Sequence, residues 1–119
     1  MNGTVSKPLL DTDIFIDHLR GKRRLPVGRD GASYSVVTRC ELFAGSEDEE
    51  GPVRELLAPL QELPVGREVA ELAGQLRRDI GIHVPDALIA ATALRLGLTV
   101  VTRNLRHFES VPHLRVSPG

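Results

Sequence analysis

The sequence has little of several residue types that mark particular classes of protein. It holds one cysteine, no tryptophan, one tyrosine and three phenylalanines in 119 residues. A single cysteine excludes an internal disulfide, and no cluster of Cys and His has the spacing of a zinc finger. The scarcity of aromatic side chains makes base stacking on aromatic platforms a poor means of nucleic-acid recognition.

Long apolar runs and a strong net charge are also absent. No uncharged apolar stretch approaches the ~20 residues that span a bilayer, and the N-terminal segment lacks the apolar core of a secretion signal. We therefore expect a cytoplasmic protein with no membrane partner. The net charge of -1 forces neither a nucleic-acid partner nor disorder. With 41% hydrophobic residues, the chain is expected to form one domain, residues 1–119, with a real core.

What the sequence does contain is an alternation of short apolar strands and helices. Strands are expected just before Asp11 and at residues 33–37, 98–102 and 114–116. Helices are expected from Asp11 to Gly21, from Thr38 to Gly45, from Pro52 to Pro59, and at residues 67–81 and 85–97. The acidic run at residues 46–50 is expected to be a surface loop. This alternation predicts an α/β domain with a parallel sheet between helix layers.

Three acidic residues, Asp11, Glu41 and Asp86, fall at strand-to-helix junctions or just inside the helices that follow. Each has an ordinary structural explanation: Asp11 or Asp13 caps a helix, Glu41 completes a capping box with Thr38, and Asp86 favours the positive end of its helix. A parallel sheet, however, gathers such junctions at one edge, where ligands bind. Gathered carboxylates repel unless a cation intervenes, and Mg²⁺ or Mn²⁺ favours hard oxygen ligands.

Four segments in order, LLDTDIFIDHL, SVVTRCELFAG, HVPDALIAATAL and LTVVTRNLRHF, resemble the PIN domain, and most of all the VapC-type ribonuclease toxins of toxin–antitoxin pairs. The resemblance covers nearly the whole chain. It implies a three-layer α/β/α sandwich around a parallel sheet, with Asp11, Glu41 and Asp86 as the catalytic acids that bind Mg²⁺ or Mn²⁺. It also implies an endoribonuclease that cleaves structured RNA of the tRNA or rRNA class with metal-activated water. Such toxins form homodimers and are inhibited by a cognate antitoxin protein.

One position departs from the family pattern. Many relatives carry a further acidic residue in the segment that corresponds to TRNLRHF, where this chain has Asn104. Asn104 can coordinate through its carbonyl oxygen or hold a water, but it adds no negative charge. The number of metal ions, one or two, therefore stays open. Asp13 and Thr102 are expected to support the site by orienting the polar groups beside them.

Basic residues near the acids are expected to hold RNA phosphates, because the acidic cluster itself repels the RNA backbone. Arg103 and Arg106 are the candidates nearest to the site. Lys22, Arg23 and Arg24 form a basic run that either extends the RNA track or is an exposed loop that keeps the protein soluble. Both interpretations of this run stay open.

The first two helices also carry apolar residues that could form a groove for a partner, although such a stripe is more often core. These residues are Ile14, Ile16, Leu19, Leu42 and Phe43. Cys40 is expected to be a small buried hydrophobe, and the histidines receive no catalytic role because they lack metal-ligand spacing.

Two other functions compete with that of a nuclease. A haloacid-dehalogenase-type phosphatase also begins with a strand and Asp-x-Asp, but it requires a later lysine, and the only lysines are Lys7 and Lys22. The remaining alternative is a catalytically degenerate PIN-like module that binds RNA or a protein partner without cutting. The missing late acid is its main support, and metal binding discriminates it from a nuclease.

Overall fold

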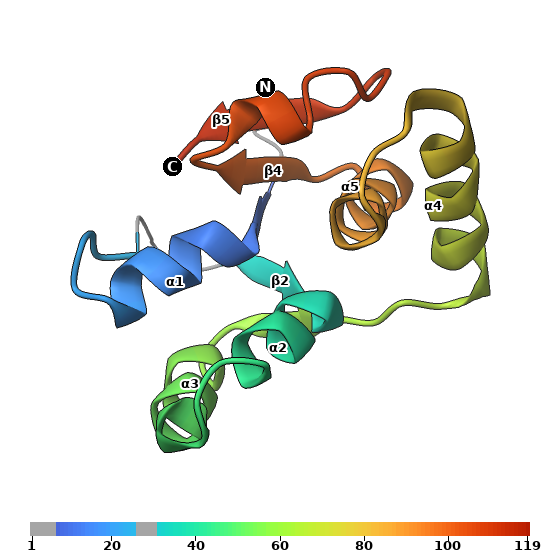
Figure 1. The fold of residues 1–119 in the computed structure, drawn as a ribbon. Coiled ribbons are helices and arrows are strands. Elements are labelled where there is room, and N and C mark those ends of the chain that lie inside the picture. The colour runs from blue at the N-terminus through green and yellow to red at the C-terminus, as the bar shows by residue number, and fades with distance from the viewer. Residues whose placement is uncertain (1–6, 26–30) are drawn as a thin grey trace.

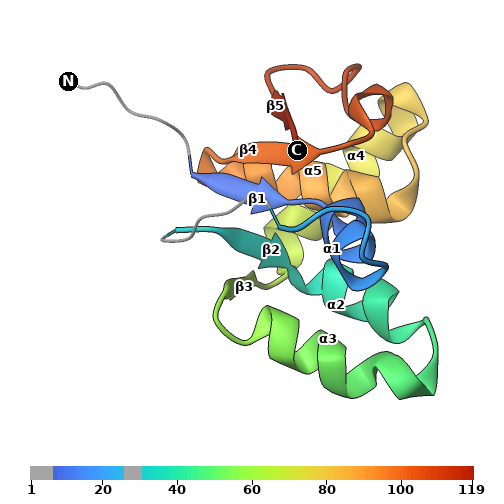
Figure 2. The ribbon, with the colours of Figure 1, turned by 90° about the vertical axis from the view of Figure 1, so that its left-hand side faces the viewer.

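The computed structural model describes residues 7–25 and 31–119, which form a five-stranded parallel sheet with helices on both faces (Figures 1 and 2). The elements in chain order are β1 Pro8–Leu10, α1 Thr12–Leu19, β2 Ser33–Ser35, α2 Val36–Phe43, the 3-10 helix η1 Glu47–Glu49, α3 Glu50–Leu57, β3 Gln61–Leu63, α4 Arg67–Ile80, α5 Val84–Leu96, β4 Thr99–Thr102, the 3-10 helix η2 Leu105–His107 and β5 Arg115–Pro118. Residues 1–6, in which a secretion signal was sought, lie outside the described residues. No helix in the described ranges is both long and apolar enough to cross a membrane.

The order of the strands, β3-β2-β1-β4-β5, creates a reversal in the middle of the sheet. The chain builds outward from β1 through β2 to β3 and then crosses to β4, which lies on the other side of β1. Ligands of open α/β sheets bind at the carboxyl ends of the strands beside such a reversal. The β1–β4 register pairs Leu10 with Val101. The residues that follow them, Asp11 and Thr102, therefore lie side by side at the reversal.

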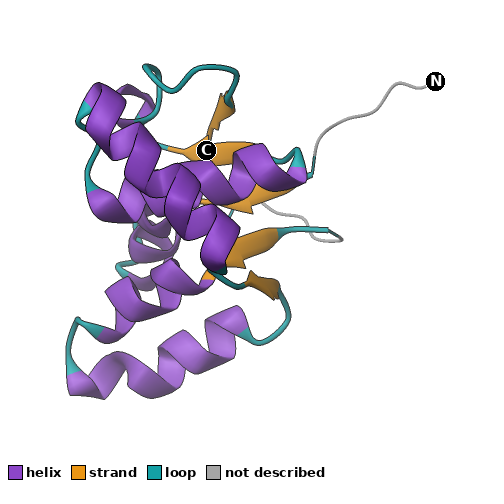
Figure 3. Ribbon diagram, turned by 90° about the vertical axis from the view of Figure 1, so that its right-hand side faces the viewer, coloured by secondary structure: helices purple, strands orange, loops and turns teal. Residues whose placement is uncertain are grey.

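Two apolar cores lie on opposite faces of the sheet, because successive strand residues point to opposite faces. Leu9 and Val100 belong to the core that α4 and α5 cover, whereas Leu10 and Val101 belong to the core formed with α1, α2 and α3. Figure 3, viewed from the side of α4 and α5, shows these helices in front of the strands. The architecture is the three-layer α/β/α sandwich that the resemblance implies.

The predictions for the helices and strands from residue 67 onward are confirmed. α4, α5, β4 and β5 all begin and end within two residues of the predicted ranges. Gly81 and Gly97 end α4 and α5 in the left-handed conformation, with φ of 72° and 68°. A residue without a Cβ adopts this conformation without steric cost, which is why glycine is a strong helix stop.

The helix expected to begin near Thr38 begins two residues earlier, so the strand expected at residues 33–37 ends at Ser35. α2 begins at Val36, and Ser35 is its N-cap, with a side chain that accepts a hydrogen bond from the Val37 N–H. Thr38 lies inside the helix and is fully buried. It therefore forms no capping box with Glu41, and that explanation for the glutamate does not hold.

Two further elements differ from the expectations: the acidic run and the edge strand β3. The acidic run at residues 46–50 is exposed or half-buried as expected, but it forms η1 and the start of α3 instead of a loop, so the helix begins at Glu50 and not at Pro52. β3 was not predicted, because Gln61 and Glu62 are polar and exposed. This strand forms by pairing with β2 at the edge of the sheet, which is a tertiary interaction.

Candidate active site

Asp11 lies at the carboxyl end of β1 and is the N-cap of α1. Its backbone N–H donates to the Val101 carbonyl (2.9 Å). Its Oδ1 accepts from the Thr12 N–H (2.8 Å), and its Oδ2 accepts from the Thr102 hydroxyl (2.8 Å). The residue is only 5% exposed. Asp11 therefore does cap α1, and the same position puts its carboxylate at the reversal of the sheet.

Asp13, in the first turn of α1, faces the same point. Its Oδ2 accepts from the Arg103 N–H (3.0 Å) and lies 3.1 Å from the Thr102 hydroxyl, whose single proton is shared between Asp11 and Asp13. Its Oδ1 is buried and has no hydrogen-bond partner among the described residues. A buried carboxylate oxygen without a partner is costly, because it has lost its water and gained nothing in exchange. This oxygen is the clearest sign that a cation or another ligand fits beside it.

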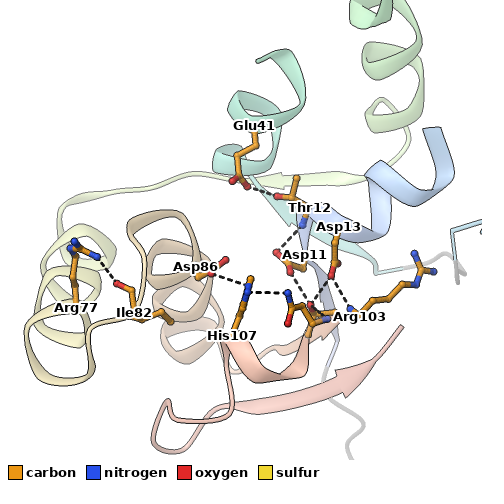
Figure 4. Close-up of polar contacts among 11 residues, drawn as sticks. Asp11, Thr12, Asp13, Glu41, Arg77, Ile82, Asp86, Arg103 and His107 are labelled. Carbon is orange, nitrogen blue, oxygen red and sulfur yellow. Dashed lines mark hydrogen bonds and ion pairs between the residues drawn. The ribbon is translucent and has the colours of Figure 1, made fainter. Parts of the chain in front are cut away.

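Glu41 and Asp86 approach from two other helices (Figure 4). Glu41 extends from α2, and its Oε1 accepts from the Thr12 hydroxyl (2.6 Å). Asp86 lies in the first turn of α5, and its Oδ2 is 3.2 Å from His107 Nδ1. The turn before α5 is anchored by Arg77, whose guanidinium donates to a backbone carbonyl of that turn (2.9 Å). Four acids, from the start of α1 and from α2 and α5, thus lie around the ends of β1 and β4.

These carboxylates interact electrostatically. Burial is the main reason that the pKa of Asp11 rises from 3.8 to about 7, and the charges of Asp13 and Asp86 raise it further, against the hydrogen bond from Thr102. Burial is also the main cause that raises the pKa of Asp86, and the charge of Glu41 adds to the rise. Asp11 and Asp86 therefore hold their protons more tightly than they would in water, chiefly because they are buried and also because other carboxylates lie near them.

The donor set fits a hard divalent cation. Carboxylate oxygens are the ligands that Mg²⁺ and Mn²⁺ prefer, and the unpartnered Oδ1 of Asp13 adds an available donor. Within residues 7–25 and 31–119, no group of three or more His, Cys, Asp or Glu side chains is close enough together to hold a metal ion as it stands. The acids surround the site without forming a closed set of ligands.

Asn104 contacts His107 through its side-chain amide. Its Nδ2 lies 2.9 Å from His107 Nε2, and its backbone N–H donates to the Thr102 hydroxyl (2.9 Å). An amide nitrogen only donates, so His107 Nε2 accepts and Nδ1 carries the proton that faces Asp86. His107, for which the sequence predicts no catalytic role, therefore contacts one of the candidate acids. The signal that could have found it is its position three residues after Asn104, in the same short turn.

The predicted RNA-binding residues lie in three settings. Arg103 is 14% exposed, and its Nη1 forms an ion pair with Asp17 Oδ2 (3.0 Å), so its guanidinium is held against α1 and does not support the expected phosphate contact. Arg106 is exposed in η2, beside the site. Residues 22–24 are exposed in the turn after α1. α1 is about 12 Å long, and Asp11 lies at its other end.

A groove of about 240 Å³ lies between α1 and α2. Ile16, Leu19 and Leu42 line it, together with Glu41 from the acidic site. Three of the five apolar residues expected in a partner groove are therefore present. Ile14 is fully buried and belongs to the core instead.

Comparison with known proteins agrees with this geometry. The sequence pattern described as the PIN domain matches residues 9–114. The chain is 34% identical to ribonuclease VapC19 of Mycobacterium tuberculosis, across 90% of this chain and 96% of the relative. It is 31% identical to the tRNA(fMet)-specific endonuclease VapC of Salmonella typhimurium, across 92% and 96% of the two chains. A DNA-bound VapBC structure from Salmonella typhimurium has a TM-score of 0.84 and 28% identity, across 96% and 98%.

The acids at the sheet reversal and the match over residues 9–114 define the class of this protein: the chain belongs to the PIN-domain family. Within that family, its similarity to curated relatives extends over nearly the full length of VapC proteins. The resemblance drawn from the four sequence segments is therefore confirmed.

Proposed function

We propose that this protein is an endoribonuclease that uses Mg²⁺ or Mn²⁺, acts on structured RNA of the tRNA or rRNA class, and is the toxin of a type II toxin–antitoxin system. The main support is the meeting of four carboxylates at the β1–β4 reversal, where the pKa of Asp11 is raised to about 7. Such a cluster destabilises the fold unless a cation neutralises it. The relatives' names, ribonuclease and tRNA(fMet)-specific endonuclease, support the same activity.

In this proposal Asp11, Glu41 and Asp86 hold the cation through carboxylate oxygens, and Asp13, whose Oδ1 has no hydrogen-bond partner among the described residues, supports them. When bound, the cation lowers the pKa of a water and neutralises the charge that develops on a phosphodiester. The chain supplies position: Thr102 holds the Asp11 carboxylate in place through its hydroxyl. The products expected from this route have a 5′-phosphate and a 3′-hydroxyl.

The groove between α1 and α2 is the surface that we assign to the cognate antitoxin. Its apolar lining, Ile16, Leu19 and Leu42, suits the apolar face of a partner helix. Glu41 lies at the groove as well as at the acidic site, so a chain lying in the groove reaches the carboxylates directly. A basic side chain of the antitoxin placed there would compete with the cation. The similarity to a VapBC structure supports such a partner.

A homodimer is part of the same proposal. α5 leaves two large apolar side chains on the surface, one at each of its ends, Val84 at 51% and Leu96 at 56% exposure. A second copy of the chain would remove this apolar surface from water. Light scattering on the purified protein tests this directly, since a monomeric mass at micromolar concentration would contradict it.

The activity is tested by incubating the antitoxin-free protein with a set of purified RNAs, initiator tRNA first, in the presence of Mn²⁺. We expect cleavage by the wild type that a chelator stops and that Asp11→Asn and Asp86→Asn abolish. Products with a 2′,3′-cyclic phosphate would exclude the proposed route. RNA binding without cleavage, unchanged in both variants, would favour the degenerate PIN-like module.

A further inference from the structure

We propose that Thr12 is a positioning residue for Glu41, and that Thr38 supports it through a chain of buried hydroxyl groups. The inference rests on the proposed nuclease function only in its last step, the role of Glu41 toward a cation. Its geometry stands independently: Thr12 Oγ1 lies 2.8 Å from Thr38 Oγ1 and 2.6 Å from Glu41 Oε1.

Proton counting fixes the direction of this chain. A carboxylate only accepts hydrogen bonds, so the Thr12 hydroxyl donates its single proton to Glu41. The Thr12 oxygen must then accept in its contact with Thr38, and the Thr38 hydroxyl is the donor. The chain therefore runs from Thr38 through Thr12 to Glu41, with each proton used once.

Thr12 connects two of the proposed cation-binding acids. Its backbone N–H donates to Asp11 Oδ1 (2.8 Å), while its side chain donates to Glu41 Oε1. Asp11 precedes α1 and Glu41 lies on α2, so one residue sets the relation between acids from two separate elements. The second oxygen of Glu41, Oε2, has no hydrogen-bond partner within residues 7–25 and 31–119 and is left for another ligand.

Because the two hydroxyl groups are buried, they keep the same hydrogen-bond partners. Thr12 is 6% exposed and Thr38 is fully buried, so neither hydroxyl can exchange its partner for bulk water at low cost. Glu41 itself is an exposed residue with several rotatable bonds, and without a fixed donor its carboxylate would sample many positions. The buried pair of threonines removes that freedom.

Thr12→Val and Thr12→Ser test this role. Valine keeps the shape and removes the donor, whereas serine keeps the hydroxyl. Supporting groups of metal ligands typically change metal affinity about 10- to 100-fold when removed, so we expect Thr12→Val to weaken Mn²⁺ binding by about 10-fold or more and Thr12→Ser to restore most of it. Isothermal titration calorimetry measures both.

Thr92→Val is the matched control. Thr92 is equally buried, but its hydroxyl donates to the Leu88 carbonyl within α5, away from Glu41. Thr92→Val should leave the Mn²⁺ affinity unchanged, whatever it does to the stability of the protein. A general effect of burying valine in place of threonine would instead appear in both proteins.

A double-mutant cycle shows whether Thr12 acts through Glu41. In a Glu41→Ala background, Thr12→Val should change the Mn²⁺ affinity no further, because the group that it positions is gone. An equal loss in both backgrounds would contradict the proposal, as would wild-type affinity in Thr12→Val.

Crystal structures of metal-free wild type and Thr12→Val separate this inference from the proposed function. We expect the Glu41 carboxylate to be ordered against residue 12 in the wild type and displaced in the variant. An unmoved Glu41 overturns the positioning role even if Mn²⁺ binds. A displaced Glu41 in a protein that binds no Mn²⁺ supports the positioning role and contradicts the nuclease.

Discussion

Thr102 donates its hydroxyl proton to Asp11 across a sequence separation of 91 residues, at 2.8 Å. The contact follows from the parallel register of β1 and β4, which sets the two residues side by side at the end of their strands. Thr102 is fully buried, and its oxygen also accepts from the Asn104 N–H (2.9 Å). The core thus provides Asp11 with a specific hydrogen-bond donor. This donor reduces the free-energy cost of burying the carboxylate, but part of that cost remains.

The remaining cost of burying the ionised Asp11 carboxylate predicts how the stability of the protein depends on pH. The folded protein binds the Asp11 proton more tightly than the unfolded chain does, since its pKa is about 7 when folded against 3.8. The free energy of unfolding of the metal-free protein should therefore fall as the pH rises from 3.8 to about 7, by at most about 1.4 kcal/mol per pH unit from this group. Urea unfolding at a series of pH values measures it.

Asp11→Asn is the control for this pH dependence. Asparagine has no proton to lose, so the variant should be more stable than the wild type above pH 7 and should lack the Asp11 part of the slope. Saturating Mn²⁺ should stabilise the wild type at pH 8 and not the variant, because only a protein that binds the ion gains from it. Parallel slopes for the two proteins would show that Asp11 is ionised at an ordinary pH.

Arg103 and Arg106 should respond differently to substitution by alanine. Arg103→Ala leaves Asp17 without its half-buried partner, so we expect a loss of about 1–2 kcal/mol in the free energy of unfolding. Arg106→Ala should change stability by less than about 0.5 kcal/mol, because the side chain is exposed.

In RNA binding, Arg106→Ala should have a larger effect than Arg103→Ala, the reverse of their order in stability. If Arg106 contacts a phosphate, Arg106→Ala lowers the slope of log affinity against log salt concentration by about 0.7–0.9. Fluorescence anisotropy with Asp86→Asn, which keeps the RNA intact, measures this slope. An unchanged slope would remove Arg106 from the RNA track.

His107 should support Asp86. Its Nδ1 faces Asp86 Oδ2, and the amide of Asn104 orients the ring from the other side. His107→Ala removes this partner and should weaken Mn²⁺ binding, with a smaller loss in Asn104→Ala, which acts only through the ring. Calorimetry at one fixed pH compares the two. A larger effect of Asn104→Ala would indicate that the asparagine contacts the ion itself.

His113 carries backbone strain that a substitution should relieve. It has a φ of 67° and lies exposed in the turn before β5. Side chains with a Cβ pay about 1–2 kcal/mol in this region, and only glycine adopts it without that cost. His113→Gly should therefore raise the free energy of unfolding by up to about 1 kcal/mol without changing RNA cleavage, a gain reduced by the greater freedom of glycine in the unfolded chain. A loss of stability would show that the imidazole makes a contact that outweighs the strain.

The fold was predictable wherever local and tertiary signals agree. α4 and α5 combine a clear apolar pattern with a terminal glycine, and β4 is an apolar β-branched run. β3 has no such signal. Its Glu62 is held instead by Tyr34 of β2 and Arg39 of α2, two contacts that no local pattern reveals.

The site was predictable only where the position of a residue follows from the strands. Strand register alone brings Asp11 next to Thr102, and a parallel sheet with strands before both residues implies that neighbourhood. Side-chain rotations do not follow from register. The turn of Asn104 toward His107 and the exposure of Cys40, which was expected to be buried, both depend on where short helices end. The role of Thr12 depends on Thr38 lying inside α2, a helix whose start was misplaced.

Mn²⁺ binding is the measurement on which the proposed function depends, because it needs no knowledge of the RNA. We would titrate Mn²⁺ into the purified, antitoxin-free wild type and into Asp11→Asn and Asp86→Asn, with Asp48→Asn in the exposed η1 as a control. The acidic cluster predicts binding by the wild type and the control that is lost in both site variants, whose folding is checked by circular dichroism. Equal behaviour of all four proteins would contradict a shared metal site and leave these acids as helix caps and structural partners.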